Sequence, residues 1–350
     1  MPAWDWLTKS KTLNAAALTV RAQRLPENDN GKLLYPLFFK KTNVKSMEAH
    51  ELVSLDYRPV AGRREWNAPE RRIDLPIPAQ RDLEFIPIGA DHMINEKEID
   101  RISNQVDGNE QVFRNLIGAD IPSRAEMLAM ACKRQMELDC FEAWTDGTLT
   151  QVDPQTGNYY VVSYGISSDR IQVAGTAWSA AANAYLEFID WLKDAKQAIG
   201  PLEGVLAKSD VYDTILADVP QINGLPLRGD DLLKRIKDDA QIDRFGFFEH
   251  NGTVDKFING GRKKTRVDVF ADRKMVAIPR GGIVGDAAYA PVARAREIAR
   301  QMPQAKINLN DVTIFYFGEN DDKALKIVAQ LNAYPAIEEQ NVFSINIGAA

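Results

Sequence analysis

The sequence predicts an α+β fold, and three patterns carry that prediction. A capped apolar stretch over residues 123–144 has the spacing of one long helix. Runs rich in β-branched and aromatic residues, such as those at 159–165 and 312–317, have the composition of strands. Residues 36–90 hold two strand-like runs around a tip rich in Arg and Pro. We therefore expect a long helix packed on β-structure, with an extended arm.

The composition is that of an ordinary globular protein. The 350 residues are 45% hydrophobic and 26% charged, which is enough for two or three modules of typical domain size. A net charge of -6 argues against a protein that coats nucleic acid with a continuous basic surface. Residues 1–90 carry 14 Lys and Arg against 11 Asp and Glu, a charge of +3, and the rest carries 29 against 38, or -9. A positive arm and a negative body can attract each other between copies.

Cysteine use and hydropathy point to a cytoplasmic protein. Cys132 and Cys140 are eight residues apart in one predicted helix, so they lie roughly 12 Å apart and cannot bridge each other. Two unpaired thiols fit a reducing compartment, and we interpret them as core residues. No apolar run approaches the roughly 20 residues of a membrane span. Residues 1–20 lack the long apolar core of a secretory signal.

The arm is expected to find its partner surface elsewhere. Residues 52–57 alternate, with Val53, Leu55 and Tyr57 on one face of a strand, and residues 83–88 form the returning run. The tip between them is too long for an ordinary hairpin loop and too charged to be buried alone. Docking on another subunit is the functional interpretation. The alternative is an edge hairpin on its own domain with a solvated Arg tip.

Two helices should follow the arm. One begins at Asn95, with Glu98 placed to complete its cap, and runs in pieces as far as Gly118. The second begins after Pro122 with a capping box formed by residues 123–126, and it ends at Gly147. Its apolar residues form a broad stripe that should pack on a sheet: Met127, Leu128, Ala131, Cys132, Met136, Leu138, Cys140, Phe141 and Trp144. Its charged residues should fill the opposite side: Arg124, Lys133, Arg134, Glu137 and Asp139.

The second half of the chain alternates strands and helices. Residues 148–165 read as a β-hairpin with a turn at 153–157, and Trp178 precedes a helix over 180–199. A short helix at 232–236 and strands at 245–249 and 275–279 follow. Residues 249–253 read as a hairpin turn. The last strands are expected at 312–317 and 342–347.

The sequence contains almost no pattern that is typical of a catalytic site. His50, His92 and His250 are far apart, and none has the spacing of a metal site. Residues 260–265 superficially resemble a phosphate loop but have Lys263 where the second Gly is required. Paired Asp residues could hold a divalent ion, yet solvated loop charges are the commoner outcome: Asp230-Asp231, Asp238-Asp239 and Asp321-Asp322. We expect no catalytic residues, no metal and no cofactor.

The order of these parts resembles the lambda-type (protein E) major capsid proteins of tailed bacteriophages, which have the HK97 capsid fold. The resemblance runs from about Tyr35 to the end of the chain, and the order of the motifs carries it. The motifs are Leu37-Phe38-Phe39 entering the arm, the capped helix, Phe141–Trp144 running into the hairpin that closes on Val162–Gly165, Trp178 before its helix, and Phe245–Phe248 followed by Met275–Pro279.

This resemblance implies a shell subunit that assembles into pentamers and hexamers around double-stranded DNA without sequence-specific binding. It implies an N-terminal arm over residues 1–45, an E-loop over 46–90, a peripheral domain over 91–201 with the spine helix, an axial domain over 202–304, and a return to the peripheral domain over 305–350. The protein would assemble in the bacterial host cytoplasm, reside in the virion, and have a scaffold, a portal and a decoration protein as partners, with no membrane involved.

The E-loop would lie across a neighbouring subunit. Its candidate contact residues are Arg63, Arg64, Arg71 and Arg72, which would meet an acidic neighbour, and Trp66 as a buried anchor. Two other functions stay open. An encapsulin-like compartment would share the fold but enclose an enzyme cargo, and a cytoplasmic α+β enzyme would have to rely on carboxylate chemistry.

The sequence predicts a noncovalent shell. Some members of this fold join subunits by an isopeptide bond between an E-loop Lys and an Asn, but residues 46–96 contain six Arg and no Lys. Assembled particles boiled in detergent should therefore run as a single subunit band on a denaturing gel. A ladder of subunit multiples that survives boiling would contradict this prediction.

Overall fold

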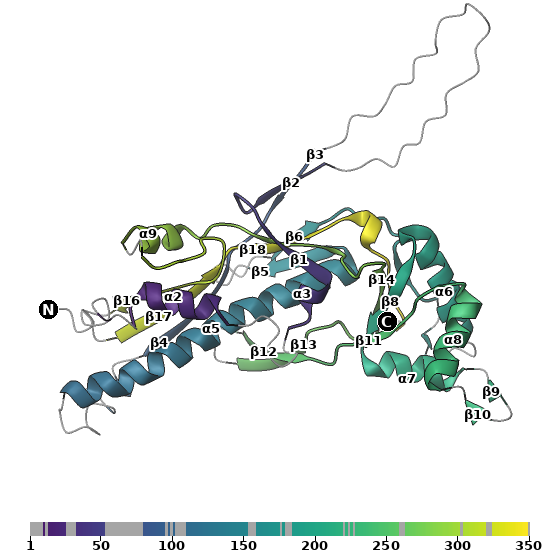
Figure 1. Cartoon of the computed structure of the whole chain (residues 1–350), viewed down its shortest axis with the longest axis horizontal. Helices are drawn as coiled ribbons and strands as arrows, with labels where there is room; N and C mark the ends of the chain where they lie inside the picture. Colours follow the sequence, from purple (N-terminus) through teal and green to yellow (C-terminus); the bar gives the residue numbers. More distant parts are fainter. Residues whose placement is uncertain are drawn as a thin grey trace, which may run out of the picture.

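The structure is a computed structural model of the whole chain. It describes residues 10, 13–25, 33–52, 80–94, 97–98, 101, 110–152, 159–175, 177–178, 184–219, 221–222, 225–226, 228–258, 263–301, 304–319 and 324–348. Figure 1 shows an elongated body built along one long helix, α5 (Glu110–Asp146), with a two-stranded ribbon rising from it. The mixture of long helix, sheets and ribbon confirms the predicted α+β class.

Helix α5 is longer than predicted. It has 37 residues and is on the order of 55 Å long, and it runs through Gly118 and Pro122, where the sequence predicted a break. Pro122 cannot donate the hydrogen bond of its turn. However, Ile121 and Ala125 are only 1% and 2% exposed in the main core, and this burial offsets the lost bond. The helix ends as predicted at Gly147, whose φ is +62°.

The predicted capping box at residues 123–126 lies inside the helix and caps nothing. Instead, the Glu126 carboxylate pairs with Arg21 of helix α2 (Ala15–Gln23), so the same residue ties an N-terminal helix to α5. The predicted helix start at Asn95 falls outside the described residues.

A three-stranded antiparallel sheet covers one side of α5. Its strands are β16 (Thr313–Glu319), β17 (Ala324–Leu331) and β4 (Ile88–Ile94), in the order β16-β17-β4. Alternate residues of β17 point into the core and are buried: Leu325, Ile327, Ala329 and Leu331. Strand β4 crosses residue 90, the predicted end of the E-loop. Five of the nine residues of the predicted stripe are buried, but Met127 is 62% exposed and Ala131 is exposed as well.

A further side of α5 is also covered. The sequence placed Lys133, Glu137 and Asp139 opposite the apolar stripe, and all three are buried. The N-terminal segment crosses this side of the helix through Leu25, Leu33 and the short helix α3 (Tyr35–Phe38). The buried Lys133 and Glu137 side chains bind backbone groups of this segment.

A small sheet and a hairpin complete this half. The sheet has the order β1-β15-β18, with β1 (Phe39–Asn43) parallel to β15 (Gly285–Tyr289) and β18 (Ala333–Ile337) antiparallel to it. The predicted hairpin is confirmed as β5 (Thr148–Val152) and β6 (Tyr159–Ser163). Helix α9 (Ala293–Gln301) lies beside β16, and the 3-10 turn η3 (Glu339–Asn341) follows β18.

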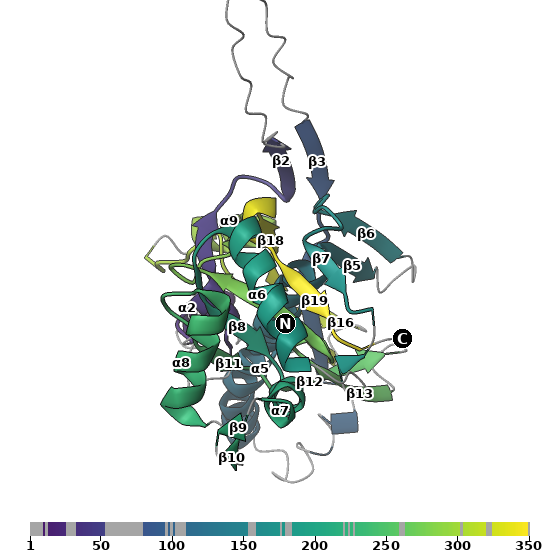
Figure 2. The same ribbon diagram turned by 90° about the vertical axis from the view of Figure 1, so that its right-hand side faces the viewer.

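A five-stranded sheet forms the other end of the body, with the order β11-β8-β14-β19-β7. The strands are β7 (Ile171–Val173), β8 (Leu202–Ala207), β11 (Phe247–Glu249), β14 (Lys274–Pro279) and β19 (Ser344–Asn346). Helices α6 (Ala184–Ile199), α7 (Ser209–Ala217) and α8 (Gly229–Ala240) pack with it around a second apolar cluster (Figure 2). The short pair β9 (Gln221–Ile222) and β10 (Leu225–Pro226) joins α7 to α8.

Residues 249–253 do not form the predicted hairpin turn. Strand β11 pairs with β8, while β12 (Thr253–Ile258) pairs with β13 (Lys263–Asp268). The intervening His250 is therefore directed into the protein and is only 6% exposed. Residues 263–265 lie in β13, which disagrees with a phosphate loop that opens a helix.

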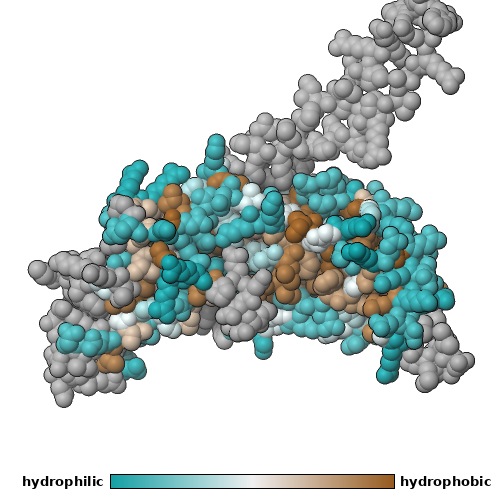
Figure 3. Space-filling model, in the orientation of Figure 1, coloured by the Kyte–Doolittle hydropathy of each residue, from teal (hydrophilic) through white to brown (hydrophobic). Residues whose placement is uncertain are grey.

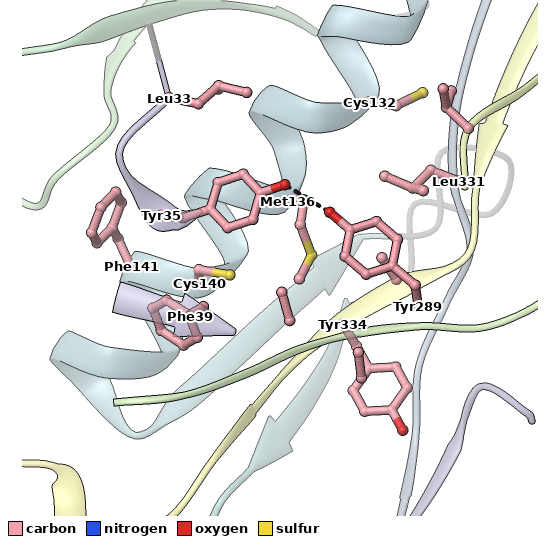
Figure 4. Packing of buried hydrophobic residues seen from close by; sticks show 14 of the residues in the cluster. Leu33, Tyr35, Phe39, Cys132, Met136, Cys140, Phe141, Tyr289, Leu331 and Tyr334 are labelled. Carbon is pink, nitrogen blue, oxygen red and sulfur yellow. Dashed lines mark hydrogen bonds between the residues drawn. The ribbon is translucent and has the colours of Figure 1, made fainter. Parts of the chain in front are cut away.

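The main core lies between α5, the three-stranded sheet and the small sheet. Figure 4 shows Tyr35, Tyr289 and Met136 meeting there, with Cys132 and Cys140 on the helix. Both cysteines are buried and free, as predicted. Within the described ranges, no helix is both long and apolar enough to cross a bilayer.

Candidate functional site: the root of the arm

The arm leaves the body as a two-stranded ribbon. Strands β2 (Glu48–Leu52) and β3 (Gln80–Glu84) pair with each other in the register Glu48↔Glu84 to Leu52↔Gln80. Both views show the ribbon directed away from the body (Figures 1 and 2). Strand pairing therefore begins about four residues earlier than the predicted strand at 52–57. The predicted contact residues Arg63, Arg64, Trp66, Arg71 and Arg72 lie outside the described residues.

The strand that enters the ribbon is fixed to the body by several polar contacts. The Val44 amide donates to the Tyr289 carbonyl at 2.8 Å, and the Asn310 Nδ2 amide donates to the carbonyls of both Val44 and Tyr289. Lys41 Nζ lies 2.8 Å from the Asp311 carboxylate and 4.4 Å from the centre of the Tyr289 ring. These contacts fix the direction in which the chain leaves β1.

The strand that returns from the ribbon is held by aromatic packing. The ring of Phe85 stacks on Tyr334 with centroids 4.2 Å apart and an interplanar angle of 5°. The next amide, that of Ile86, donates to Gln151 Oε1 of β5 at 2.9 Å. In the same region, the Tyr164 hydroxyl donates a hydrogen bond to the Pro335 carbonyl at 2.7 Å. The ribbon is thus anchored on both sides by buried groups.

Two buried charged residues of α5 hold the segment that precedes the arm. Lys133 Nζ donates to the Leu25 carbonyl at 3.1 Å. One helical turn later, Glu137 Oε1 accepts the amides of Leu34 at 2.5 Å and Tyr35 at 3.4 Å. The Tyr35 hydroxyl then lies 2.7 Å from that of Tyr289, the residue that also holds the entering strand (Figure 4). A connected network of hydrogen bonds therefore joins helix α5, the N-terminal segment and the root of the arm.

His250 approaches the same carboxylate from the five-stranded sheet. Its Nε2 lies 3.9 Å from Glu137 Oε1, and its ring packs on Phe141. Burial lowers the pKa of His250 from 6.5 to about 4, so the imidazole is neutral near pH 7 and this contact is no ion pair there. Burial raises the pKa of Glu137 from 4.5 to about 7, although the Leu34 and Tyr35 amides and Arg134 oppose that shift.

A second polar cluster ties β4 to the first half of α5. The Arg124 guanidinium binds Asp120 at 2.5 Å and Glu98 at 2.6 Å, and it also contacts His92 Nε2. Burial, and then the charge of Arg124, lower the pKa of His92, so a neutral ring accepts from the guanidinium. This arrangement holds β4 against α5. In the described ranges, no three His, Cys, Asp or Glu side chains gather as a metal site would require.

Comparison with known proteins gives no sequence relative. No protein-family model matches the chain, and no curated protein matches it. Among solved structures, the proposed capsid protein of a prophage from Escherichia coli CFT073 is 14% identical and superposes with a TM-score of 0.58, over 96% of this chain and 99% of that chain. The chain has the HK97 capsid fold.

Two further solved structures match the chain with lower TM-scores. The capsid of a native GTA particle is 11% identical, with a TM-score of 0.49 over 91% of this chain and 90% of that chain. A phage-related protein from Bordetella bronchiseptica RB50 is 10% identical, with a TM-score of 0.46 over 94% and 95%. The HK97 fold predicted from the order of motifs is thus confirmed by the superposition on the prophage protein.

The buried carboxyl predicts how stability depends on pH. A group whose pKa is raised on folding contributes stability below its unfolded pKa and loses it as pH rises through the folded value, so Glu137 destabilises the fold as pH rises from about 4.5 to 7. His250 acts in the opposite sense and loses stability as pH falls from 6.5 through about 4. Glu137→Gln keeps the carbonyl that accepts the amides but removes the titration.

We expect the difference in unfolding free energy between Glu137→Gln and the parent to shift by about 2–3 kcal/mol in favour of the variant between pH 5 and pH 8. The measurement is denaturant unfolding at both pH values. Glu187→Gln, on the exposed face of α6, is the control. A difference that stays constant with pH would show that Glu137 does not titrate in this range.

Proposed function

We propose that this chain is the major capsid protein of a tailed bacteriophage or prophage, which assembles into an icosahedral shell around double-stranded DNA. The observation that carries the proposal is the superposition on the prophage capsid protein over nearly the full length of both chains. The ribbon that projects from a firmly anchored root supports it, because a two-stranded ribbon is stabilised by packing on a larger surface.

The geometry of the root favours docking on a neighbouring subunit. In the described part of the arm, β2 and β3 pair only with each other. A two-stranded ribbon is marginally stable alone in water. Since Lys41, Asn310 and Phe85 fix both strands to the body, the ribbon is presented in one direction before it binds. This preorganisation lowers the entropy cost of assembly.

Within this proposal, the arm tip and the modules have the roles predicted from the sequence. Arg63, Arg64, Arg71 and Arg72 make charge-assisted contacts with an acidic surface of the neighbour, and Trp66 is an anchor. Residues 202–304 form the axial domain, and residues 91–201 with 305–350 form the peripheral domain. A scaffold, a portal and a decoration protein are the expected partners, and the virion is the final location.

The proposal is tested by expressing the full chain alone and imaging the heaviest fraction from a sizing column by negative-stain electron microscopy. Shells, tubes or capsomer rings are the expected result. If only small species form, co-expression with the genes adjacent to it in its genome supplies a scaffold. A chain that stays monomeric at high concentration with scaffold present is no capsid protein, and enzyme cargo inside the shells would assign it to an encapsulin-like compartment.

The arm contacts are tested by reversing charge at the tip. Arg71→Glu with Arg72→Glu should leave a folded subunit that assembles at least about tenfold less well at equal concentration, because like charges would then face each other across the contact. Lys193→Glu with Lys234→Glu makes the same change in net charge on exposed positions of α6 and α8 and serves as the control. Normal shells from the arm variant would remove these residues from the interface.

A further inference from the structure

Two ionisable side chains lie next to each other in the interior of the protein. Hydrophilic side chains cover much of the face that Figure 3 shows, but the side chain of Glu137 is only 1% exposed and that of His250 only 7%. The two residues come from different parts of the fold, since Glu137 belongs to α5 and His250 follows β11 of the five-stranded sheet. This pair therefore lies where the sheet meets the helix.

The surroundings of His250 determine which ring nitrogen carries the hydrogen. The Gly252 amide donates to Nδ1 at 3.4 Å, so Nε2 carries the hydrogen of the neutral imidazole. In the part of the chain that the structure describes, the buried Nε2 has no hydrogen-bond partner. It lies 3.9 Å from Glu137 Oε1, which is about 1 Å longer than an N–H···O hydrogen bond. His250 is thus a buried donor just beyond hydrogen-bond distance of a carboxyl group.

The ring of His250 and the turn that follows it are in close contact. On one side, the ring packs on Phe141 of α5 with centroids 5.2 Å apart. On the other side, a Cβ on Gly252 would meet the ring carbon Cε1 at 2.6 Å, so glycine is needed there. The Gly252 carbonyl also accepts the Val269 amide at 2.9 Å. A shift of the ring toward Glu137 would therefore move the turn at 250–252 with it.

Glu137 needs a further donor only when its carboxyl group is ionised. The amides of Leu34 and Tyr35 both donate to the same oxygen, Oε1. A buried carboxylate is unfavourable unless enough donors surround it, whereas the protonated acid is neutral. The ionised form of Glu137 should therefore attract any neutral donor that can reach it.

The other ionisable groups around Glu137 are less suited to this role. They are Lys133, Arg134, Asp139 and Cys140 of α5, Tyr35 of α3 and Tyr289 of β15. Lys133 already binds a backbone carbonyl, and the two tyrosine hydroxyls bind each other. Arg134 is exposed and acts on Glu137 through its charge. His250 is the donor whose hydrogen is directed at the carboxyl group from the five-stranded sheet.

We propose that His250 and Glu137 form a pH-sensitive contact, in which ionisation of Glu137 draws His250 inward by about 1 Å so that Nε2 donates to Oε1. The proton of the carboxyl group leaves for solvent, and the imidazole stays neutral throughout. The carboxylate then binds donors from the N-terminal segment and from the turn after β11 at the same time. Because the N-terminal segment leads into the arm, this contact couples the five-stranded sheet to the root of the arm.

The two side chains titrate in different ranges, as this contact requires. Burial raises the pKa of Glu137 to about 7, so its ionisation falls between about pH 6 and pH 8. Burial lowers the pKa of His250 to about 4, so the ring remains neutral in that range. The contact should therefore form as the pH rises through neutrality.

The test is an NMR titration of the full-length subunit, below the concentration at which it assembles, with 13C in the glutamate side-chain carboxyl groups. Glu137→Gln identifies the signal of Glu137. His250→Phe keeps a ring against Phe141 but removes the donor, so the titration midpoint of Glu137 should rise by about one pH unit. His250→Gln keeps a donor and should show a smaller rise. His50→Phe, in ribbon strand β2, is the control.

A second readout needs no change at His250. In the parent, the 15N signal of His250 Nε2 should shift with the same midpoint as the Glu137 carboxyl and keep the values of a neutral ring. Glu137→Gln should abolish this shift.

Three results would overturn the proposal. They are a Glu137 midpoint that is the same in the parent and in His250→Phe, equal rises in His250→Phe and His250→Gln, and a His250 ring that becomes positively charged between pH 6 and pH 8. All of them are measured on free subunits, so none depends on whether the chain forms shells.

Discussion

The central constraint on this structure is that α5 is enclosed on more than one side. The three-stranded sheet packs on one face, the N-terminal segment crosses another, and β14 and β19 of the five-stranded sheet reach its C-terminal part. Charged side chains of α5 that the N-terminal segment covers cannot stay solvated. They must be matched by buried partners, and Lys133 and Glu137 find them in the backbone at Leu25, Leu34 and Tyr35.

This requirement joins the interior to the arm. Glu137 accepts the Tyr35 amide, and the Tyr35 hydroxyl is hydrogen-bonded to that of Tyr289. The Tyr289 carbonyl accepts the amide of Val44, on the chain that enters the ribbon, and Lys41 Nζ lies over the Tyr289 ring. Removing one member would leave a buried polar group without its partner, which typically costs more than the bond itself contributes. The direction of the arm is thus set by the same contacts that stabilise the core.

Much of the fold could be predicted from local patterns. The hairpin β5–β6, the strands β11, β14 and β16, and the end of α5 at Gly147 all follow from residue spacing and turn chemistry. The order of these parts also pointed to the HK97 fold. Pro122 misled the prediction because tertiary burial of Ile121 and Ala125 outweighs a local break, and nothing within ten residues of Pro122 reveals that burial.

Less of the candidate site than of the fold could be predicted from the sequence. An arm that needs a partner surface was predicted, but the residues that hold its root, such as Asn310 and Tyr334, are more than 200 positions away along the chain. The spacing of Lys133 and Glu137 is one sequence signal of this site, because residues four positions apart share a helix face. That spacing is equally typical of a solvent-exposed ion pair. Only the path of the N-terminal segment distinguishes the two cases.

The pairing of β1 with β15 has a consequence for the timing of synthesis. Phe39 lies opposite Gly285, and Phe85 stacks on Tyr334, so two main contacts of the arm root join residues about 250 positions apart. Contacts of such long range form late in folding. A ribosome has to release the chain beyond Tyr334 before the ribbon is fixed in place by this stacking. Nascent chains that have not reached Tyr334 therefore lack an anchored arm.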